Sequence, residues 1–328
     1  MNQPLLDVKN LSVAFEMGRG ALTVSSDVSF TLEKGKVLGL IGESGSGKTV
    51  TSMAILGLLS DQARVTADHV KYRGTDIHKL PAHEFDKLRG ADLAMIFQDP
   101  VGSFNPVKTI GWHFLNVGKR HRREAGSNKA LNALAREALA KVDIADPANA
   151  LRKYPHQLSG GMLQRCLIAL VLFCKPSLIV ADEPTTNLDN LVERQIISLF
   201  DKLRHEIDAS FIFITHDMTI AEQVSDSMIV MYAGQIVEQG DTQQVLQQPR
   251  HPYTQGLVRT ARELEGDVEM LTEIAGDIGT GIWPADKCRF APRCPLYESA
   301  CDHPIALREI EGHGKVRCIK ADLKDTAA

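Results

Sequence analysis

Alternating apolar and polar positions open the chain and predict strands. Residues 5–15 and 28–32 follow this alternation in part, which is typical of half-buried antiparallel strands. Residues 37–41 are instead a continuous apolar run that ends at Gly42, as in a strand buried on both faces. We therefore expect antiparallel strands first and a central buried strand after them.

Helix and strand patterns alternate through the middle of the chain. Ser127 is a predicted N-cap, because apolar residues follow it at helical spacing, and residues 167–173 predict a buried helix. Strands that alternate with helices indicate an α/β domain with a mostly parallel sheet. Buried strands are predicted at residues 94–97, 178–181 and 211–215, and a hairpin at residues 228–231 and 236–238, joined around Ala233 and Gly234.

The character of the sequence changes near residue 240. Prolines and glycines recur from Asp241 onward, and four of the six cysteines fall between residues 288 and 318. We therefore predict two domains, a large one over residues 1–240 and a small appended one over residues 241–328.

Composition narrows the class of protein without giving a function. The chain has 328 residues, of which 44% are hydrophobic and 24% charged, as in ordinary soluble globular proteins. Its net charge of -4 argues against a surface built to bind nucleic acid. No secretory signal is visible, and the longest apolar run, residues 166–174, is far shorter than the ~20 residues of a membrane-spanning helix. Any role at a membrane is therefore expected to be peripheral, and the cysteines are not expected to form disulfides.

A glycine-rich turn follows the buried strand. Residues 42–49 read GESGSGKT and match the G-x-x-x-x-G-K-[ST] pattern of a phosphate-binding loop. The glycines let successive N–H groups point at phosphate oxygens, and a helix that begins at Lys48 adds its positive dipole end. Lys48 is expected to contact the β and γ phosphates of a bound nucleotide, and Thr49 to offer its hydroxyl to Mg²⁺. The predicted loop residues are Gly42, Ser44, Gly45, Ser46, Gly47, Lys48 and Thr49.

Two carboxylates follow the predicted strand at residues 178–181. An acid at the end of a buried strand is costly unless it meets a cation, so Asp182 is expected to hold Mg²⁺ opposite Thr49. Glu183 would then polarise the water that attacks the γ phosphate. The plainer interpretation, two solvated acids in a loop, is weakened by the phosphate-binding loop. His216 also follows a predicted strand and is expected to contact the γ phosphate.

One further motif connects these features to a known family. Residues 158–164 read LSGGMLQ, and here the sequence resembles the ABC ATPases, whose LSGGQ-type signature lies at the start of a helix. The resemblance implies a head-to-tail dimer in which this loop completes the ATP site of a partner subunit. Ser159 would contact that phosphate through its hydroxyl, and Ser159, Gly160 and Gly161 would contact it through their N–H groups.

The resemblance also implies a fold. It covers residues 5–240 and implies an ABC-type P-loop NTPase with a RecA-like parallel sheet core and N-terminal antiparallel strands. A helical subdomain is expected at about residues 100–175, and the C-terminal region is expected to be a small extension.

Other residues match further elements of that family. The resemblance implies that Gln98 lies in the Q-loop and links Mg²⁺ and water to a transmembrane partner. It implies that residues 186–189 form the D-loop and that His216 is the switch histidine. Phe15 is the candidate for the aromatic side chain that stacks on adenine, with Val24 as the alternative.

Two residues depart from the usual family pattern, and two other functional classes are weighed against the transporter. Asn187 and Leu163 replace the usual residues of the D-loop and the signature, but neither removes a catalytic group, so hydrolysis is expected. A module that holds ATP without hydrolysing it is disfavoured because Glu183 and His216 are present. A soluble ABC ATPase of translation or DNA repair is disfavoured because there is one set of motifs and residues 50–157 lack coiled-coil heptads.

The C-terminal region resembles one subfamily of importers. Residues 251–257 read HPYTQGL and residues 288–295 read CRFAPRCP, which are similar to segments of the oligopeptide, dipeptide and nickel importers, closest to dipeptide permeases. The resemblance implies a peripheral subunit at the cytoplasmic face of a bacterial inner membrane that energises import of di- or oligopeptides. A nickel, metal-chelate or other small-solute importer is the alternative. Residues 101–106 are expected to help dock a membrane subunit.

That subfamily also implies partners. These are a second, different ABC ATPase subunit, two transmembrane permease subunits and an extracytoplasmic substrate-binding protein. No nucleic-acid partner is expected.

The cysteines of the C-terminal region could hold a metal. Four thiolates suit zinc or an iron–sulfur cluster, although their spacing is not that of a zinc ribbon. The resemblance to peptide importers favours a [4Fe–4S] cluster, with zinc or four unligated thiols as alternatives. Cys166 and Cys174 are expected to be packing residues. The four candidate ligands are Cys288, Cys294, Cys301 and Cys318.

Overall fold

The computed structural model forms two compact units. It describes residues 3–17, 20–186, 188–265, 274, 276–278, 283 and 286–322. The first unit contains the described residues of segments 1–79 and 213–328, and the second contains those of segment 80–212.

An antiparallel sheet forms the N-terminal part of the first unit. Its strands are ordered β2-β1-β5-β6, and β4 pairs with β1 as well. Leu11 and Val13 of β1 are buried, and α1 packs on β1 and β2. The two predicted antiparallel strands are therefore confirmed. Both extend beyond the residues that alternate between apolar and polar in the sequence. The elements are β1 (Leu6–Met17), β2 (Gly20–Leu32), α1 (Lys48–Ile55), β4 (Ala63–Thr66), β5 (His69–Tyr72) and β6 (Thr75–Asp76).

A second set of strands in the first unit carries the central buried strand. Within this unit the order is β12-β13-β11-β10-β3, with β3 parallel to β10 and the other pairs antiparallel. All five residues of β3 are buried, as predicted. The predicted hairpin turns at Ala233 and Gly234, both of which have positive φ angles. The strands are β3 (Val37–Ile41), β10 (Ser227–Tyr232), β11 (Gln235–Asp241), β12 (Arg308–Ile310) and β13 (Gly314–Val316).

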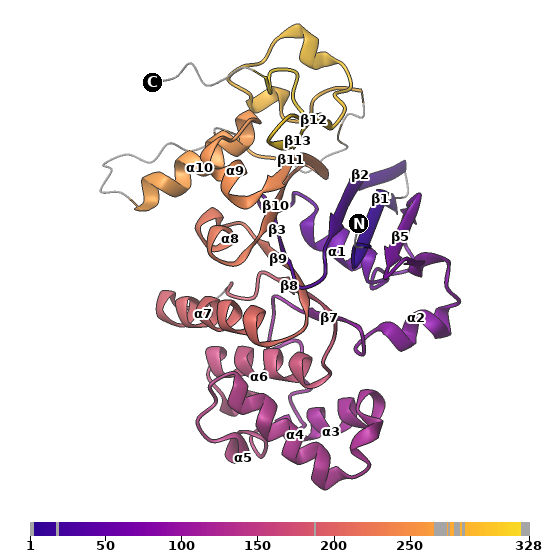
Figure 1. The fold of residues 1–328 in the computed structure, drawn as a ribbon, viewed down its shortest axis with the longest axis vertical. Coiled ribbons are helices and arrows are strands. Elements are labelled where there is room, and N and C mark those ends of the chain that lie inside the picture. Colours follow the sequence, from indigo (N-terminus) through magenta and orange to yellow (C-terminus); the bar gives the residue numbers. More distant parts are fainter. Residues whose placement is uncertain are drawn as a thin grey trace. The chain divides into compact units, whose positions relative to one another are not determined.

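The chain after residue 240 shares a hydrophobic core with the strands before it. Tyr232 at the end of β10 makes edge-on ring contacts with Tyr253 and Phe290, and all three side chains are buried. Figure 1 shows α9 and α10 beside these strands, with the yellow C-terminal segment continuing into β12 and β13. The predicted boundary near residue 240 stays a prediction. The helices of this unit are α8 (Met218–Val224), α9 (Thr242–Gln247) and α10 (Pro252–Glu265).

The second unit consists mainly of helices around a pair of parallel strands. β7 and β8 pair in register, with Ile96 opposite Ala181. In Figure 1, α3, α4 and α6 lie side by side in this unit, and they pack on one another. The Ser127 hydroxyl accepts a hydrogen bond from the Ala130 N–H at 3.1 Å, which confirms the predicted cap. The elements are α2 (Ala82–Leu88), β7 (Leu93–Ile96), α3 (Ile110–His121), α4 (Asn128–Lys141), α5 (Pro147–Ala150), α6 (Gly160–Phe173), β8 (Leu178–Asp182) and α7 (Asn190–Glu206).

The remaining regular elements are short. Strand β9 (Ser210–Thr215) is fully buried, as its apolar sequence predicts. No described helix is long and apolar enough to cross a membrane. Single 3-10 turns lie at Ile77–Lys79, Arg123–Ala125, Pro155–Gln157, Ala291–Arg293 and Ser299–Asp302.

Candidate functional site

The phosphate-binding loop of the first unit joins β3 to α1. Gly42, Gly45 and Gly47 all have positive φ angles, which side chains other than hydrogen disfavour. A Cβ atom at Gly42 would lie 2.2 Å from the Met231 carbonyl oxygen, so the loop also packs against the end of β10 too closely for any other residue. The sequence pattern predicted this loop, and the structure gives the steric reason for its first glycine.

Lys48 occupies the centre of that loop. Its buried ammonium group donates hydrogen bonds to the carbonyl oxygens of Gly42 at 2.7 Å and Glu43 at 3.0 Å, so the loop curls around the charge. The Ser46 hydroxyl is buried and has no hydrogen-bond partner among the described residues. Thr49 is half-buried in the first turn of α1. A buried cation beside an unsatisfied hydroxyl at a helix N-terminus fits an anionic ligand such as a phosphate group.

The second unit brings three predicted residues together at the ends of two parallel strands. Gln98 follows β7, and Asp182 and Glu183 end and follow β8. The Gln98 amide donates to Oε2 of Glu183 at 3.3 Å, and the Thr186 hydroxyl donates to the same oxygen at 2.9 Å. Asp182 is buried. These contacts orient one carboxylate oxygen of Glu183.

The backbone of Glu183 is itself unusual. Its φ angle is +42°, in the left-handed region that costs a residue with a side chain on the order of 1 kcal/mol. The turn is closed by a hydrogen bond from the Thr186 N–H to the Glu183 carbonyl oxygen at 3.2 Å. Such conformations concentrate at functional sites, where surrounding structure holds them.

The signature segment begins α6 in the second unit. Ser159 is its N-cap and accepts a hydrogen bond from the Met162 N–H at 3.3 Å. Ser159 and Gly160 are exposed, whereas a Cβ atom at Gly161 would lie 2.5 Å from Cγ1 of Val192 on α7. Gly160 therefore keeps the start of α6 accessible, whereas Gly161 allows α7 to pack closely against α6.

The departures from the usual family pattern have different outcomes. Leu163 is buried in the core of the second unit, which explains an apolar residue at that position. Asn187 lies outside the described residues. Asp189 caps α7 by accepting a hydrogen bond from the Val192 N–H at 3.0 Å. The end of the predicted D-loop is therefore a helix cap.

His216 and Phe15 lie in the first unit. His216 is exposed and directly follows β9, at the carboxyl end of that strand. Phe15 is partly exposed on β1 between Leu22 of β2 and Ala63 of β4. Val24 is likewise partly exposed on β2, and its carbonyl oxygen would lie 2.9 Å from a Cβ atom at Gly47.

The two cysteines of α6 are buried, and burial raises the pKa of both the Cys166 and the Cys174 thiols to about 12. They are therefore neutral packing residues, as expected. Burial also raises the pKa of Cys318 to about 11, with the thiolates of Cys294, Cys288 and Cys301 adding to that shift. The four C-terminal thiols thus lie near enough to influence one another. In the part of the chain that the structure describes, no three Cys, His, Asp or Glu side chains surround a single-ion site.

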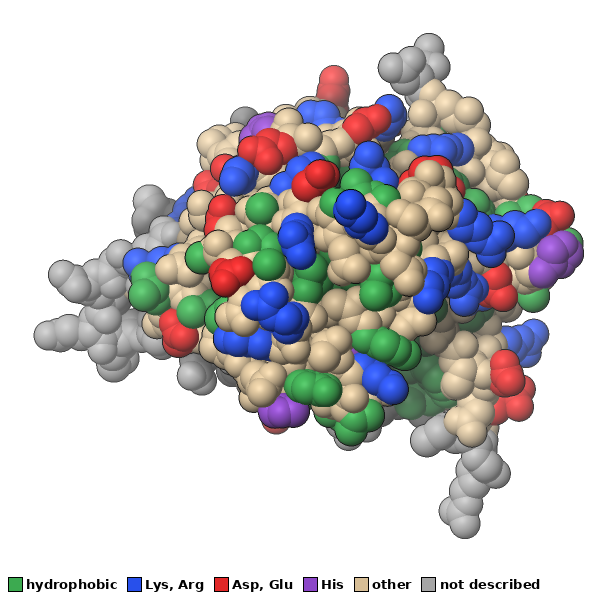
Figure 2. Space-filling view, turned by 90° about the horizontal axis from the view of Figure 1, so that it is seen from below, with side chains coloured by type: hydrophobic (Ala, Val, Ile, Leu, Met, Phe, Trp, Pro, Cys, Tyr) green, Lys and Arg blue, Asp and Glu red, His purple; other side chains and the backbone are tan. Residues whose placement is uncertain are grey.

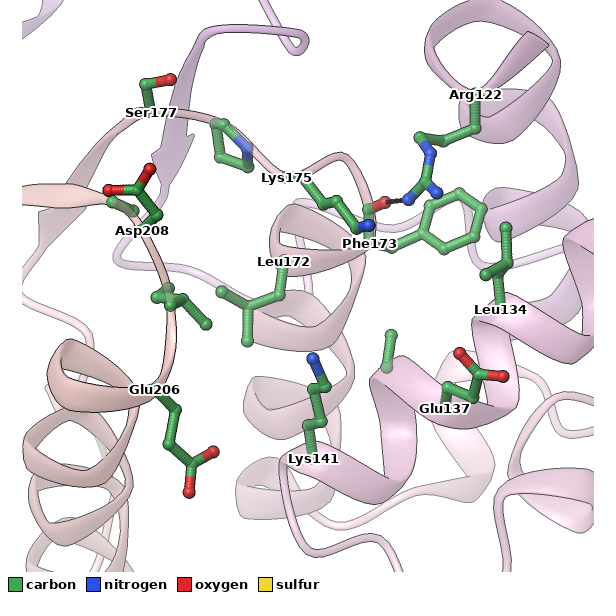
Figure 3. A pocket seen from close by; sticks show the side chains of 14 residues that line it. Arg122, Leu134, Glu137, Lys141, Leu172, Phe173, Lys175, Ser177, Glu206 and Asp208 are labelled. Carbon is green, nitrogen blue, oxygen red and sulfur yellow. Dashed lines mark hydrogen bonds between the residues drawn. The ribbon is translucent and has the colours of Figure 1, made fainter. Parts of the chain in front are cut away.

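A pocket of about 400 Å³ in the second unit contains none of the predicted site residues. Figure 3 shows Lys141 and Lys175 lining it, with Arg122 hydrogen-bonded to the Phe173 carbonyl oxygen at the end of α6. A cationic donor at that position satisfies a terminal carbonyl and complements the helix dipole. The Arg122 contact therefore supports the end of a helix.

One set of contacts at the phosphate-binding loop was not predicted. Arg293 forms a two-pronged ion pair with Glu43, and the Tyr253 hydroxyl accepts a hydrogen bond from the Glu43 N–H. Tyr253 and Arg293 belong to the two C-terminal segments that marked the importer subfamily. Nothing in sequence spacing pairs residues about 210 and 250 positions away with this loop.

Two family profiles match the chain. The ABC transporter family matches residues 25–186, and the C-terminal region of oligopeptide/dipeptide transporters matches residues 237–301. The dipeptide transport ATP-binding protein DppD of Haemophilus influenzae is 40% identical over 314 residues, or 96% of this chain and 94% of the relative. DppD of Bacillus subtilis is 41% identical over 301 residues, or 92% and 89%.

Solved structures agree with the predicted fold. The dimeric structure of MJ0796, a bacterial ABC transporter cassette, has a TM-score of 0.65 and 25% identity, covering 72% of this chain and 98% of that one. The cbiO1 structure of Clostridium perfringens, part of the ABC transporter complex cbiONQ, has a TM-score of 0.63 at 23% identity, covering 75% and 92%. The predicted ABC-type α/β fold is confirmed.

Proposed function

Because this chain belongs to the ABC transporter family of ATP-binding subunits, we propose that it hydrolyses ATP to drive import of di- or oligopeptides across a bacterial inner membrane. The observation that supports nucleotide binding is the position of Lys48, whose ammonium group is buried inside its own loop and bonded to the Gly42 carbonyl oxygen. The peptide part is supported by the matching oligopeptide/dipeptide C-terminal region and by relatives named for dipeptide transport.

The phosphate-binding loop would bind the triphosphate. Lys48 exchanges its two carbonyl contacts for the β and γ phosphate oxygens, and the N–H groups of residues 42–49 surround the same oxygens. The buried Ser46 hydroxyl, unsatisfied within the described chain, gains an acceptor. Phe15 stacks on the adenine ring. Bound nucleotide thus gives the Ser46 hydroxyl the acceptor that it lacks among the described residues.

Three oxygen-bearing side chains would hold Mg²⁺. These are Thr49, Gln98 and Asp182, each a hard ligand of the kind that magnesium prefers. When bound, the ion neutralises charge on the β and γ phosphates. Asp182 ends β8 and Gln98 follows the adjacent parallel strand β7, so both side chains start from one edge of this strand pair.

Glu183 would act as the general base. Gln98 and Thr186 orient its carboxylate, which would accept a hydrogen bond from the attacking water. His216 would contact the γ phosphate and report whether it is present. The strained backbone of Glu183 supports the assignment, because strain of this kind is retained where a side chain must be aimed.

A second ATPase subunit would complete each site. The exposed N-terminus of α6, with Ser159 and Gly160, offers N–H groups and a hydroxyl to phosphate bound by the partner. This arrangement is supported by the dimeric cassette with the same fold. We propose that the partner is a different ATPase chain, and that two transmembrane permease subunits and an extracytoplasmic binding protein complete the importer. The subunit would act peripherally at the cytoplasmic face.

Exposed apolar side chains after Gln98 supply a docking surface for a permease subunit. Val101 and Val107 are 64% and 72% exposed, and Trp112 on α3 is 42% exposed. Figure 2 shows one face of the molecule, on which hydrophobic side chains lie among Lys and Arg side chains; it does not label the residues of this docking surface.

The four C-terminal cysteines are the proposed ligands of a [4Fe–4S] cluster. Cys288 donates its N–H to the Cys301 carbonyl oxygen at 3.0 Å, so the backbone brings these two residues side by side. Zinc, which four thiolates also suit, is the alternative. A [4Fe–4S] cluster is held by four Cys thiolates, which matches the number in this segment. When bound, it would cross-link the segment from Cys288 to Cys318.

ATP binding and turnover by the purified chain test the nucleotide part of this proposal. We expect saturable, Mg²⁺-dependent binding that the Lys48→Ala substitution abolishes. Exposed Lys34 provides a matched control, since Lys34→Ala should leave binding unchanged. Binding that survives Lys48→Ala would contradict the assigned site. Peptide specificity is tested separately, by uptake of dipeptides and of nickel chelates in cells that depend on this subunit.

A further inference from the structure

The phosphate-binding loop is held from outside by an ion pair. Nη1 and Nη2 of Arg293 lie 2.9 and 3.2 Å from the two carboxylate oxygens of Glu43, the second residue of the loop. The Arg293 side chain is 6% exposed and that of Glu43 is 29% exposed. A two-pronged, largely buried pair of this kind is much stronger than an exposed one, whose net contribution is small.

Arg293 is fixed at its other contacts as well. Nη2 also donates to the Ile274 carbonyl oxygen at 3.0 Å, and the guanidinium lies 5.7 Å from the centre of the Tyr232 ring. Burial alone would lower the pKa of Arg293, but hydrogen bonds to Glu43 and Tyr232 raise it above its usual value. The guanidinium is therefore charged and has little freedom to leave Glu43.

The backbone of Glu43 is held by a second C-terminal residue. Its N–H donates to the hydroxyl of Tyr253 at 2.9 Å, and Tyr253 is fully buried at the start of α10. The Tyr253 ring packs edge-on against Tyr232 at 4.8 Å. Both the side chain and the main chain of Glu43 are thus bound by the region after residue 240.

The far side of the loop is held through the β10–β11 turn. The Gly234 N–H donates to the Ser46 carbonyl oxygen at 2.9 Å. Arg289 donates Nη1 to the neighbouring Ala233 carbonyl oxygen at 2.5 Å and Nη2 to the Ser26 hydroxyl at 2.9 Å. The segment that carries Arg289 and Arg293 therefore supports the loop at two places, directly at Glu43 and indirectly at Ser46.

From these contacts we infer that Arg293 is a positioning residue for nucleotide binding, which neutralises Glu43 and keeps the phosphate-binding loop in its binding conformation. The inference rests on the proposed role of that loop in binding ATP. An unpaired carboxylate in the loop would repel the triphosphate. A loop that also samples other conformations binds more weakly in proportion to its competent fraction.

The test is the dissociation constant of ATP for the full chain with the Arg293→Met substitution, which keeps the apolar stem and removes the charge. We expect about a tenfold weaker affinity, the usual scale for losing a hydrogen-bonded charge. Exposed Arg259 on α10 gives the matched control, and Arg259→Met should bind ATP like the unsubstituted chain. Equal affinity in the unsubstituted chain and Arg293→Met would overturn the inference.

A second substitution separates the charge effect from general loosening of the fold. Glu43→Gln in the Arg293→Met background removes the unpaired carboxylate, so the double variant should bind ATP several-fold more tightly than Arg293→Met alone. No recovery would contradict the inference. If Arg293→Met fails to fold, Arg293→Lys, which keeps the charge but loses the two-pronged contact, should weaken ATP binding to a smaller extent; unchanged affinity there would also contradict it.

Failure of the inference is distinguishable from failure of the proposed function. If the unsubstituted chain does not bind ATP at all, the proposed function is wrong. If it binds ATP and Arg293→Met binds equally well, only the role of Arg293 is wrong.

Discussion

Gln98 and Glu183, which are separated by 85 positions in the sequence, form a side-chain hydrogen bond at 3.3 Å at the ends of β7 and β8. Because these strands are parallel and adjacent, their carboxyl ends present both side chains at one edge. Gln98 is the start of the segment proposed to contact a permease subunit, and Glu183 is the proposed general base. A movement of that segment would therefore reach the proposed base through one hydrogen bond.

Glu183→Gln should separate ATP binding from ATP hydrolysis. The amide keeps the shape and the Thr186 contact but cannot take a proton, so turnover should fall by about a thousandfold, within the usual range for losing a general base. ATP affinity should stay within about threefold. Steady-state phosphate release and nucleotide titration measure the two quantities. Turnover equal to that of the unsubstituted chain would rule out Glu183 as the base.

The two signature glycines should respond differently to alanine. A Cβ atom at Gly161 would lie 2.5 Å from Val192, so Gly161→Ala should lower the free energy of unfolding by about 1–3 kcal/mol. At Gly160 the nearest atom would be 3.7 Å away, so Gly160→Ala should change stability by less than about 0.5 kcal/mol. Urea unfolding of the two variants compares them. Equal stabilities would mean that α7 does not approach α6 as described.

Acid should destabilise the first unit through His251. Its burial, together with the nearby charge of Arg317, lowers its pKa from 6.5 to about 3. The unfolded chain therefore binds a proton below pH 6.5 that the folded chain does not. Stability from this residue is complete above pH 6.5 and is lost as pH falls toward 3, by at most about 1.4 kcal/mol per pH unit.

The substitution that tests this effect is His251→Asn. Asparagine can still accept the hydrogen bond from the Tyr253 N–H that Nδ1 of His251 accepts, but it does not titrate. Between pH 6.5 and 4 the unfolding free energy of His251→Asn should fall less steeply than that of the unsubstituted chain. His205→Gln, at a well-exposed position, is the control. Parallel pH profiles for the unsubstituted chain and His251→Asn would show that His251 does not contribute.

Anaerobically purified protein should be brown and contain about four irons and four sulfides, if the C-terminal cysteines bind the proposed cluster. Cys294→Ser should lose most of the iron, while Cys174→Ser, at a buried cysteine of the second unit, should retain it. Iron and zinc analysis with visible absorbance makes the measurement. If the analysis finds one zinc per chain, the cysteines form a zinc site instead of a cluster. If it finds no metal, the thiols have only a packing role.

Local patterns were enough to predict much of the fold and the motif positions. The apolar run of β3, the Ser127 cap and the hairpin around Gly234 depend on neighbouring residues, so sequence spacing contains them. Hydrophobic spacing predicted only residues 167–173 of α6, because the polar and glycine residues at its start do not follow a helical pattern. The family resemblance implied a helix start at the signature, and Ser159 does cap α6. Strands β12 and β13 have three residues each, which is too few for an alternating apolar and polar pattern to be recognised in the sequence.

Contacts between distant segments could not be predicted in the same way. The Glu43–Arg293 pair joins a loop residue to one 250 positions later, and both residue types are ordinary surface residues in isolation. Tyr253 was noticed as part of a subfamily motif, but its hydroxyl contact with the loop depends on how α10 packs. Burial of Leu163 likewise follows from the face that α6 turns to the core.

Peptide import driven by this subunit can be measured as uptake of a labelled dipeptide by the assembled transporter in sealed vesicles, with ATP on the side of this subunit. We predict that uptake requires ATP, is abolished by Lys48→Ala in this subunit and is strongly reduced by Glu183→Gln. Uptake that continues unchanged with both substitutions, or transport of nickel chelates with no transport of peptides, would contradict the account.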